Sequence, residues 1–571
     1  MSDAEGTCEY VLDPNDPETW GGKADENCLI DDEILDEDGV WACPHDAEAD
    51  KDRCIFHLPI EEKADDEGVD AFLDAVDETS PSDDTETRQL EFVGAKFGMF
   101  DLREESTLTV EDGRVALDYA TVTGVLDWSE TVLAVQKITL NGIKCDDETR
   151  FHRTQFGGET TFERGEFGKM ADFRWAEFGG EADFKEAEFN GEADFRGAAF
   201  GERVYFREAE FGGWANFPSA GFGGRASFWK AEFEGEASFV SAEFRGKAKF
   251  WEAEFGEKAD FRGAEFRKKS DFREAAFTGD RLVFSDVEFE EGPIFEDLTL
   301  DAVQFDGGDL TDSTFTGASL RNANFESTLL SRATLFDADL RGAKLNGAVL
   351  GDVRINEGTQ FLGHPSDDSG ISPHTVVAIR SRPTCIYDPA YGEDNEDQDV
   401  DKAKSVYRSL EELGGKHARP RLQARSFVRR QDLQKNEYKQ AAKERNSWEE
   451  RLIAGARWSR AKVARGTLLY GESPWRVIAW SLGIIFSFAL LYPLGGWMKP
   501  TDGNPITYAQ IAANPAEILN AIYYSTLTYT ALGFVDFQPV GFGRLLTTLE
   551  TALGAVMLAL LVFILGRRAA R

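Results

Sequence analysis

The sequence predicts a mixed fold: a four-sided coil of short β-segments, then a basic helical segment, then an all-α membrane part with two spans and a re-entrant loop. Three observations support this prediction. Phenylalanine recurs with a fixed spacing in the middle of the chain, the balance of charge reverses over residues 401–470, and the long apolar runs lie in the last hundred residues. We expect five regions: an acidic Cys- and His-containing segment (1–90), the coil (91–355), an acidic linker (356–400), the basic helices (401–470) and the membrane part (474–571).

Acidic residues dominate the composition, with 104 Asp and Glu against 62 Lys and Arg and a formal net charge of −42. A hydrophobic content of 42% argues against a disordered chain. This excess of acid is typical of proteins that work in concentrated salt, where screening weakens self-repulsion. It also argues against nucleic acid as a partner, because phosphates need a basic surface. The polar, acidic start MSDAEGTCEY predicts that the chain has no signal peptide.

The N-terminal segment contains four of the six cysteines and two histidines: Cys8, Cys28, Cys43, Cys54, His45 and His57. Cys54 and His57 are separated by two residues, a spacing common in zinc sites, and zinc takes four Cys or His ligands. A short acidic segment can bury little apolar surface, so a bound metal would explain how it folds. Two interpretations remain open. Either zinc is bound by ligands from Cys8, Cys28, Cys43, Cys54 and His57, or these are ordinary reduced cysteines.

The repeat in the middle of the chain has a strict register. From Phe151 to Phe277 the spacing between phenylalanines alternates between five and six residues, and from Leu310 to Leu350 it is five. A small residue, usually Ala, lies two positions before nearly every Phe. Neither the helical period nor the strand period fits this pattern. We therefore expect a backbone that turns a corner about every five residues and closes a four-sided coil in about 20 to 22 residues, with the large side chains stacked inside.

This register resembles that of the pentapeptide-repeat family, over about 200 residues. The resemblance implies a right-handed quadrilateral β-helix that acts as a rigid spacer or an interaction surface. Some members of the family imitate DNA with an acidic rod. The neighbouring membrane segment argues against that function in this chain.

The segment before the membrane part is basic and helical. Val406, Tyr407, Leu410 and Leu413 recur with helical spacing, and Gly414-Gly415 is expected to end this helix. Two more helices are expected over about 421–445 and 448–469. A basic segment beside a membrane span marks the cytoplasmic side and attracts anionic headgroups, so the lipid membrane is its expected partner rather than nucleic acid.

Two apolar stretches, Val477–Trp497 and Arg544–Gly566, are long enough to span a bilayer. The second is followed by Arg567, Arg568 and Arg571, so both ends of the hairpin are expected in the cytoplasm. Between the spans, Asn514-Pro515-Ala516-Glu517 has the pattern of a helix start. The helix that follows, to about Thr530, is too short to cross. Its negative C-terminal end would point into the membrane and favour a cation.

The residues after this helix, TYTALGFVDFQP over 528–539, resemble the potassium-channel filter T-x-T-T-V-G-Y-G-D followed by Pro. Arg544, Glu550 and Gly554, in the order R-x5-E-x3-G, resemble the inner helix of two-transmembrane prokaryotic channels. The stretch 470–476 is similar to the start of the first span in the known family, of haloarchaeal type, that joins pentapeptide repeats to an ion-channel domain. The resemblance implies a selectivity filter formed by Thr530, Ala531, Leu532, Gly533, Phe534, Val535 and Asp536.

The filter departs from the family pattern at four positions. Ala531 replaces Thr, Leu532 replaces Val, Phe534 replaces Tyr, and Val535 replaces the second Gly. The family glycines permit the left-handed backbone that aims carbonyls at the ion, and a β-branched Val resists that conformation. We therefore expect weaker discrimination of K⁺ over Na⁺ than in channels with the intact filter.

Together these patterns predict a homotetrameric, multi-pass cell-membrane channel for monovalent cations, chiefly K⁺, with both termini cytoplasmic. No required cofactor is expected. The sequence shows no nucleophile–base set, phosphate loop or catalytic carboxylate pair, so the protein is not expected to be an enzyme. Two alternatives stay open: a non-conducting membrane-anchored scaffold or sensor whose coil binds a partner, and a metal-dependent regulator or enzyme centred on the N-terminal cysteines.

Overall fold

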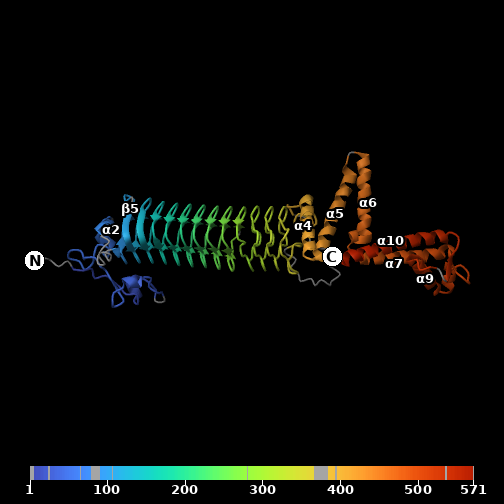
Figure 1. Ribbon diagram of the computed structural model, residues 1–571, viewed down its shortest axis with the longest axis horizontal. Helices are drawn as coiled ribbons and strands as arrows, with labels where there is room; N and C mark the ends of the chain where they lie inside the picture. Colours follow the sequence, from blue (N-terminus) through green and yellow to red (C-terminus); the bar gives the residue numbers. More distant parts are fainter. Residues whose placement is uncertain are drawn as a thin grey trace. The chain divides into compact units, whose positions relative to one another are not determined.

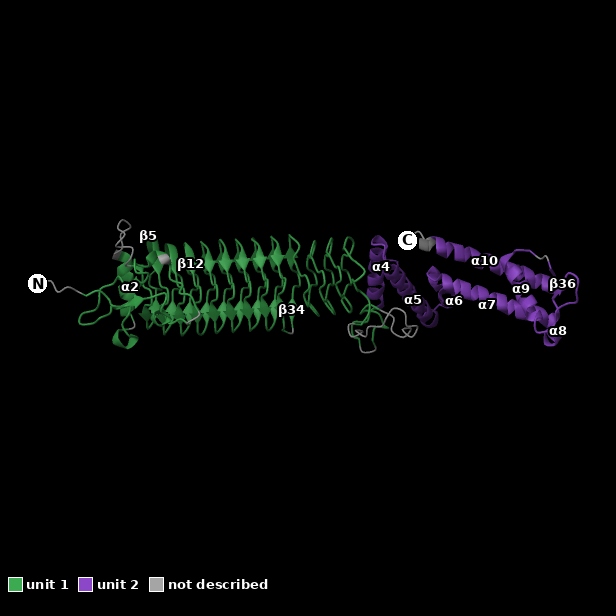
Figure 2. Cartoon of the chain, turned by 90° about the horizontal axis from the view of Figure 1, so that it is seen from below, with its two compact units in different colours: residues 1–399 green, residues 400–571 purple. Residues whose placement is uncertain are grey.

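The computed structural model describes residues 6–23, 26–64, 66–78, 90–105, 107–279, 281–364, 384–392, 395–445, 447–533 and 536–569. The chain forms two compact units, Met1–Asp399 and Val400–Arg571, shown in green and purple in Figure 2.

The first unit is built around a β-solenoid whose short parallel strands stack into four faces (Figure 1). One face consists of β3 (Lys96–Phe97), β6 (Thr121–Val122), β9 (Lys144–Cys145), β13 (Glu166–Phe167), β17 (Glu188–Phe189), β21 (Glu210–Phe211), β25 (Glu232–Phe233), β29 (Glu254–Phe255) and β33 (Ala276–Phe277). A second consists of β4 (Phe100–Asp101), β7 (Leu126–Asp127), β10 (Thr149–Arg150), β14 (Ala171–Asp172), β18 (Ala193–Asp194), β22 (Ala215–Asn216), β26 (Ala237–Ser238), β30 (Ala259–Asp260) and β34 (Leu282–Val283).

The other two faces are joined near the N-terminal end of the solenoid by two long paired strands, β5 (Thr107–Ala116) and β8 (Val132–Thr139). From β8, one face continues through β11 (Gln155–Phe156), β15 (Glu177–Phe178), β19 (Ala199–Phe200), β23 (Gly221–Phe222), β27 (Glu243–Phe244), β31 (Glu265–Phe266) and β35 (Glu288–Phe289). The other continues through β12 (Glu159–Thr161), β16 (Ala182–Asp183), β20 (Val204–Tyr205), β24 (Ala226–Ser227), β28 (Ala248–Lys249) and β32 (Ser270–Asp271).

The register between coils confirms the predicted period. Ala171 pairs with Ala193, 22 residues on, and Ala193 pairs with Ala215. In the later part, where the sequence period is five, Thr314 pairs with Thr334 across 20 residues. This pairing continues to Gln360.

Phenylalanine fills the interior in four columns, one for each face. Phe195 and Phe217 stack with their ring centroids 4.9 Å apart and their planes 3° apart, and Phe239 continues the column at 4.9 Å. Rings of adjacent columns meet edge to face, as Phe206 does with Phe217 at 5.5 Å. These rings are fully buried, and so is the small residue two positions before most of them, such as Ala182. Each coil therefore buries its rings against the coils before and after it.

One corner of the coil uses a left-handed residue two positions after the Phe. Glu208 has φ 55°, and the same conformation recurs every eleven residues at Ser219 (φ 55°) and Lys230 (φ 54°). The six-residue segments place a glycine at another corner. A Cβ on Gly246 would lie 1.9 Å from the Gly224 carbonyl oxygen, so the coils touch there backbone to backbone.

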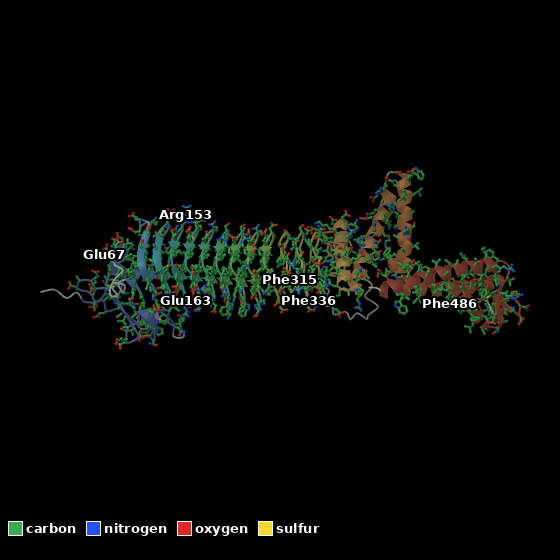
Figure 3. All side chains as sticks on the ribbon, viewed as in Figure 1. Glu67, Arg153, Glu163, Phe315, Phe336 and Phe486 are labelled. Carbon is green, nitrogen blue, oxygen red and sulfur yellow. The ribbon has the colours of Figure 1, made fainter. Side chains whose placement is uncertain are left out.

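Charged side chains cover the outside of the solenoid, and they pair between neighbouring coils; Figure 3 labels Arg153 and Glu163 on this surface. Lys185 Nζ lies 2.6 Å from Glu163, one coil away, and Lys258 lies 2.6 Å from Glu236 in the same relation. Exposed pairs of this kind contribute little each, about 0–1 kcal/mol, so the interior columns carry the stability.

Two ends of the solenoid are covered by irregular chain. The N-terminal cover contains β1 (Val11–Leu12), α1 (Pro17–Trp20), η1 (Asp32–Ile34), β2 (Trp41–Ala42), η2 (Ile60–Glu62) and α2 (Glu67–Glu78). At the other end, residues 384–392 of the expected linker lie against the last coils. The buried Tyr387 donates a hydrogen bond to Glu326 at 2.8 Å.

The second unit begins with three helices, α4 (Val400–Lys416), α5 (Pro420–Glu444) and α6 (Trp448–Leu468). The expected stop at Gly414-Gly415 is wrong, because α4 continues through both glycines to Lys416. Gly414 is instead a packing residue. A Cβ there would lie 2.7 Å from the backbone nitrogen of Gln423 on α5.

The membrane part follows as α7 (Pro474–Leu491), η5 (Tyr492–Gly495), β36 (Met498–Pro500), α8 (Tyr508–Ala513), α9 (Glu517–Thr530), β37 (Phe537–Pro539) and α10 (Gly543–Ala569). Helices α7 and α10 form a hairpin, and α9 packs against both (Figure 1). Strands β36 and β37 pair antiparallel beside the loop that joins them.

Candidate functional site

Two helices of the second unit are long and apolar enough to cross a membrane. They cover Pro474–Gly495 and Gly543–Gly566, with mean hydropathies of 2.0 and 2.3 over an 18-residue window. Large apolar side chains on them face outward, among them Phe486 (Figure 3), which is 52% exposed, and Val562, which is 70% exposed. A lipid environment or a neighbouring copy would cover these side chains.

Helix α9 lies between these spans and is too short to be a third one. Its 14 residues extend about 21 Å, against a hydrocarbon core of about 30 Å. The Asn514 side chain accepts a hydrogen bond from the Ala516 backbone nitrogen at 3.3 Å, at the turn that starts the helix. The helix therefore begins where the sequence pattern predicts.

The chain leaves α9 through a left-handed turn at Ala531, which has φ 55°. The Leu532 N–H donates to the Leu527 carbonyl at 3.2 Å and so closes the end of the helix. A non-glycine residue in this conformation costs about 1–2 kcal/mol, and sequence reasoning did not anticipate one here. Gly533 is also left-handed, with φ 93°.

The rest of the expected filter is only partly described. Thr530 is the last residue of α9, and its hydroxyl donates to the Thr526 carbonyl at 2.7 Å. Phe534 and Val535 lie outside the described residues. The Asp536 carbonyl accepts a hydrogen bond from the Thr501 backbone nitrogen at 2.9 Å, which ties the segment after the filter to the β36–β37 loop.

Glu550 of α10 is fully buried behind α9, where it joins three elements. Its carboxylate accepts a hydrogen bond from the Tyr492 hydroxyl at 2.7 Å and another from the Ser525 hydroxyl. One turn away, the Tyr524 hydroxyl lies 3.0 Å from the Thr547 hydroxyl. A buried carboxylate needs such donors, so Glu550 fixes α9 against α10 and against the end of the first span.

Gly554 lets the last turn of α9 approach α10 very closely. A Cβ at this position would lie 1.9 Å from the Tyr529 carbonyl oxygen. Beside it, the Thr551 hydroxyl donates to the Thr528 carbonyl at 3.1 Å. On the other side, the Tyr529 hydroxyl donates to Ser481 of α7 at 2.6 Å. The end of α9, from which the filter segment starts, is thus held on both sides.

The basic helices connect to the first span through a buried acid, Asp432 of α5. It pairs with Arg465 of α6 and accepts a hydrogen bond from the Tyr470 hydroxyl at 3.0 Å. Burial alone would raise the pKa of Asp432, but the hydrogen bond from Arg465 and the nearby Lys435 charge hold it below its usual value. Just beyond, Arg476 of α7 donates to the Arg465 carbonyl at 2.8 Å, so α6 and α7 are joined directly.

Several of these residues gave no signal in the sequence. Tyr492, Ser481 and Ser525 are ordinary residues of an apolar stretch, and only the fold brings them to Glu550 or Tyr529. A single Glu inside a span was the available clue, because an ionisable residue there requires partners. Arg544, the first residue of the expected inner-helix pattern, lies in the first turn of α10.

The N-terminal cysteines fall into two places. Ligand atoms of Cys8, Cys43, Cys54 and His57 all lie within 4.8 Å of one another, and all four residues are buried. Among the described residues, Cys28 lies apart from this group, next to Tyr119 on the solenoid, with which it shares a hydrogen bond. Burial raises the pKa of the Cys28 thiol.

Comparisons with known proteins agree with this division of the chain. Residues 175–221 and 300–352 match family models described as pentapeptide repeats, and residues 478–571 match a family model described as an ion channel. The protein is therefore a pentapeptide-repeat solenoid followed by a channel-like membrane domain. Both families point to a non-enzymatic protein. No curated protein matches the chain.

Solved structures are similar to the solenoid alone. Full-length QnrB1, described as a plasmid-mediated fluoroquinolone resistance protein, is 14% identical, with 43% of this chain and 94% of that chain covered and a TM-score of 0.16. A pentapeptide repeat protein, Rfr23, from the cyanobacterium Cyanothece 51142 is 17% identical, with a TM-score of 0.13. That match covers 22% of this chain and spans 63% of the cyanobacterial chain.

Proposed function

We propose that the protein is a homotetrameric cation channel that conducts monovalent cations, chiefly K⁺, across the cell membrane. The observation that carries this proposal is α9, a helix too short to cross, which polar contacts hold between two apolar spans with the filter-like segment at its C-terminal end. The match of residues 478–571 to an ion-channel family supports it.

The arrangement suits a cation for two physical reasons. The C-terminal end of α9 carries the negative end of its dipole and unpaired carbonyls, which favour a positive charge nearby. The segment that follows, from Ala531 to Val535, would supply further carbonyls in place of the ion's water shell. One hairpin provides one wall of a pore, so four copies around an axis would complete it.

Ion flux in liposomes tests the proposal. We expect the purified full-length chain to have the mass of four copies in detergent and to release a K⁺ gradient when it is reconstituted. A tetramer that gives no flux in K⁺ or Na⁺ would contradict conduction and favour a membrane-anchored scaffold or sensor. A monomer or dimer that conducts would contradict the tetrameric pore.

The altered filter makes a prediction about selectivity. The double change Ala531→Thr with Val535→Gly is expected to raise the K⁺ to Na⁺ permeability ratio at least several-fold. A β-branched Thr disfavours the left-handed turn seen at Ala531, and a Gly at 535 removes the penalty for a left-handed residue there. Both changes move the segment towards the family geometry.

Reversal potentials in mixed K⁺ and Na⁺ measure this ratio for the parent and the double variant. Leu532→Val is the matched control, since it restores a family residue without changing a position where backbone handedness is at issue. Strong K⁺ selectivity in the parent with no change in the double variant would contradict the role given to Val535.

Orientation follows from the charges next to the spans. We propose that the basic helices, the solenoid and both termini are cytoplasmic and that the loop after the first span is outside. Gly503→Cys, in that loop, should react with a membrane-impermeant thiol reagent added to intact cells. A cysteine introduced at exposed Trp448, before the first span, should react only after lysis. The reverse pattern of labelling would show the opposite orientation.

A further inference from the structure

Three thiols and one imidazole meet at the N-terminal end of the first unit. The Sγ atoms of Cys43 and Cys54 are 3.7 Å apart. His57 Nδ1 lies 3.1 Å from the Cys54 Sγ and 3.5 Å from the Cys8 Sγ. Cys54 and His57 are each 1% exposed, so water has little access to the group.

These separations fit one tetrahedral metal ion. Zinc binds thiolate sulfur at about 2.3 Å and imidazole nitrogen at about 2.0–2.1 Å. With tetrahedral angles these bonds place two sulfurs about 3.8 Å apart, and a sulfur and a nitrogen about 3.6 Å apart. The observed spacings of 3.7 Å and 3.5 Å correspond to this geometry, and the 3.1 Å spacing is somewhat tighter.

The second nitrogen of His57 has the partner that a ligating histidine usually has. His57 Nε2 lies 2.8 Å from the Val93 carbonyl oxygen, which can only accept a hydrogen bond. This contact assigns the proton to Nε2 and leaves the Nδ1 lone pair directed at the thiols. The Tyr10 ring stacks on the imidazole, with centroids 4.0 Å apart and planes 14° apart, and fixes its orientation.

We propose that Cys8, Cys43, Cys54 and His57 bind one Zn²⁺ in a closed Cys₃His site. Four protein ligands in a buried site leave no open position for a water molecule, which is the arrangement of structural rather than catalytic zinc. Soft thiolates also favour zinc over Mg²⁺ or Ca²⁺.

The location of the site indicates what the metal does. Phe56, between two of the ligands, is buried, and its ring meets Phe92 of the solenoid with centroids 4.9 Å apart. The Trp41 indole donates to the Glu91 carboxylate at 2.7 Å, and the Lys96 backbone nitrogen donates to the Phe56 carbonyl at 2.8 Å. Zinc therefore fastens the segment that covers the first phenylalanines of the solenoid, which no preceding coil would bury.

Metal content of the full-length chain, purified in detergent with reducing agent and without chelator, tests the site. We expect about one zinc per chain, as the single tetrahedral centre requires. Cys54→Ser should lower it at least fivefold. Cys28→Ser is the matched control: it removes a cysteine of the same segment that lies outside the group, and it should keep the parent content.

Because Cys54→Ser could also unfold the segment, a second measurement uses the parent chain. Replacement of zinc by Co²⁺ should give the visible ligand-field bands of a tetrahedral site and the near-ultraviolet charge-transfer bands of bound thiolates. His57→Cys, which keeps four ligands, should retain one zinc.

Three results would overturn the proposal: a parent chain free of zinc even after Zn²⁺ is added under reducing conditions, equal zinc in the parent and Cys54→Ser, or a Cys43–Cys54 disulfide in the native protein by mass spectrometry. These results are independent of ion conduction, so failure of the zinc site and failure of the channel proposal can be told apart.

Discussion

Phe206→Asp is expected to destabilise the solenoid by at least about 4 kcal/mol, because loss of a buried Phe alone costs about 3–5 kcal/mol and an unpaired buried carboxylate adds to it. Phe206 is fully buried and stacks between Phe184 at 4.8 Å and Phe228 at 5.1 Å. The interior offers the new carboxylate only aromatic rings as neighbours. The stacks on either side of it would be separated.

Denaturant unfolding of the full-length chain, followed by circular dichroism, measures the effect as a shift of the solenoid transition midpoint. Phe206→Leu is the conservative control, since Leu fills the same interior position in the later coils, as at Leu320. Lys247→Glu changes charge on the exposed surface and should shift stability by no more than about 0.5 kcal/mol. Equal midpoints for Phe206→Asp and Lys247→Glu would show that the register is misassigned.

Gly554→Ala is expected to remove most of the conductance. The added Cβ would lie 1.9 Å from the Tyr529 carbonyl oxygen, and a backbone atom cannot give way as the end of a flexible side chain can. Helix α9 must therefore shift relative to α10, and the Thr551–Thr528 hydrogen bond would be strained. Because the filter segment starts at the end of α9, a small displacement there misplaces the carbonyls that replace the ion's water shell.

Current per reconstituted channel, at equal protein content, measures this loss. Gly566→Ala is the control on the same helix, because no heavy atom of the described residues would lie within 4 Å of the Cβ that this change adds. Alanine is the better helix former, so this change should keep conduction and stability. Normal current from Gly554→Ala would mean that the close contact with Tyr529 has no functional role.

The solenoid could be predicted in detail because its sequence repeats one environment many times. Every interior position demands a large apolar side chain, so the period of phenylalanines revealed the length of the coil. The left-handed corners could not be predicted. They carry Glu208, Ser219 and Lys230, whose types give no sign of the conformation, and the tight turn after each Phe imposes it.

The membrane site was predictable where local chemistry acts and unpredictable where distant elements meet. The helix start at Asn514 is a local pattern and was found. The left-handed turn at Ala531 was missed, because the pattern resembled a family in which this residue type differs. Gly414 and Gly554 look like helix breakers in the sequence, yet both serve close contact between helices that only the fold creates.

The zinc ligands illustrate the same limit. Spacing alone gave five residues for a site that needs four, and the contact of Cys28 with Tyr119 could not be read from the chain. Folding separates Cys28 from the others, because it draws this part of the segment onto the solenoid, where the Leu29 backbone nitrogen donates to the Tyr119 hydroxyl at 2.5 Å.

The uniform stacking of the coils also has an evolutionary consequence. Each residue in the earlier part pairs with the residue 22 positions on, so a duplicated or deleted stretch of that length adds or removes one complete turn and leaves every other pairing intact. Each such event changes the length of the solenoid by about 4.8 Å, the separation of neighbouring strands. An insertion of any other size would push apolar rings to the surface. Length in this domain is thus inherited in discrete steps, and tandem duplication of a short gene segment is enough to change its reach.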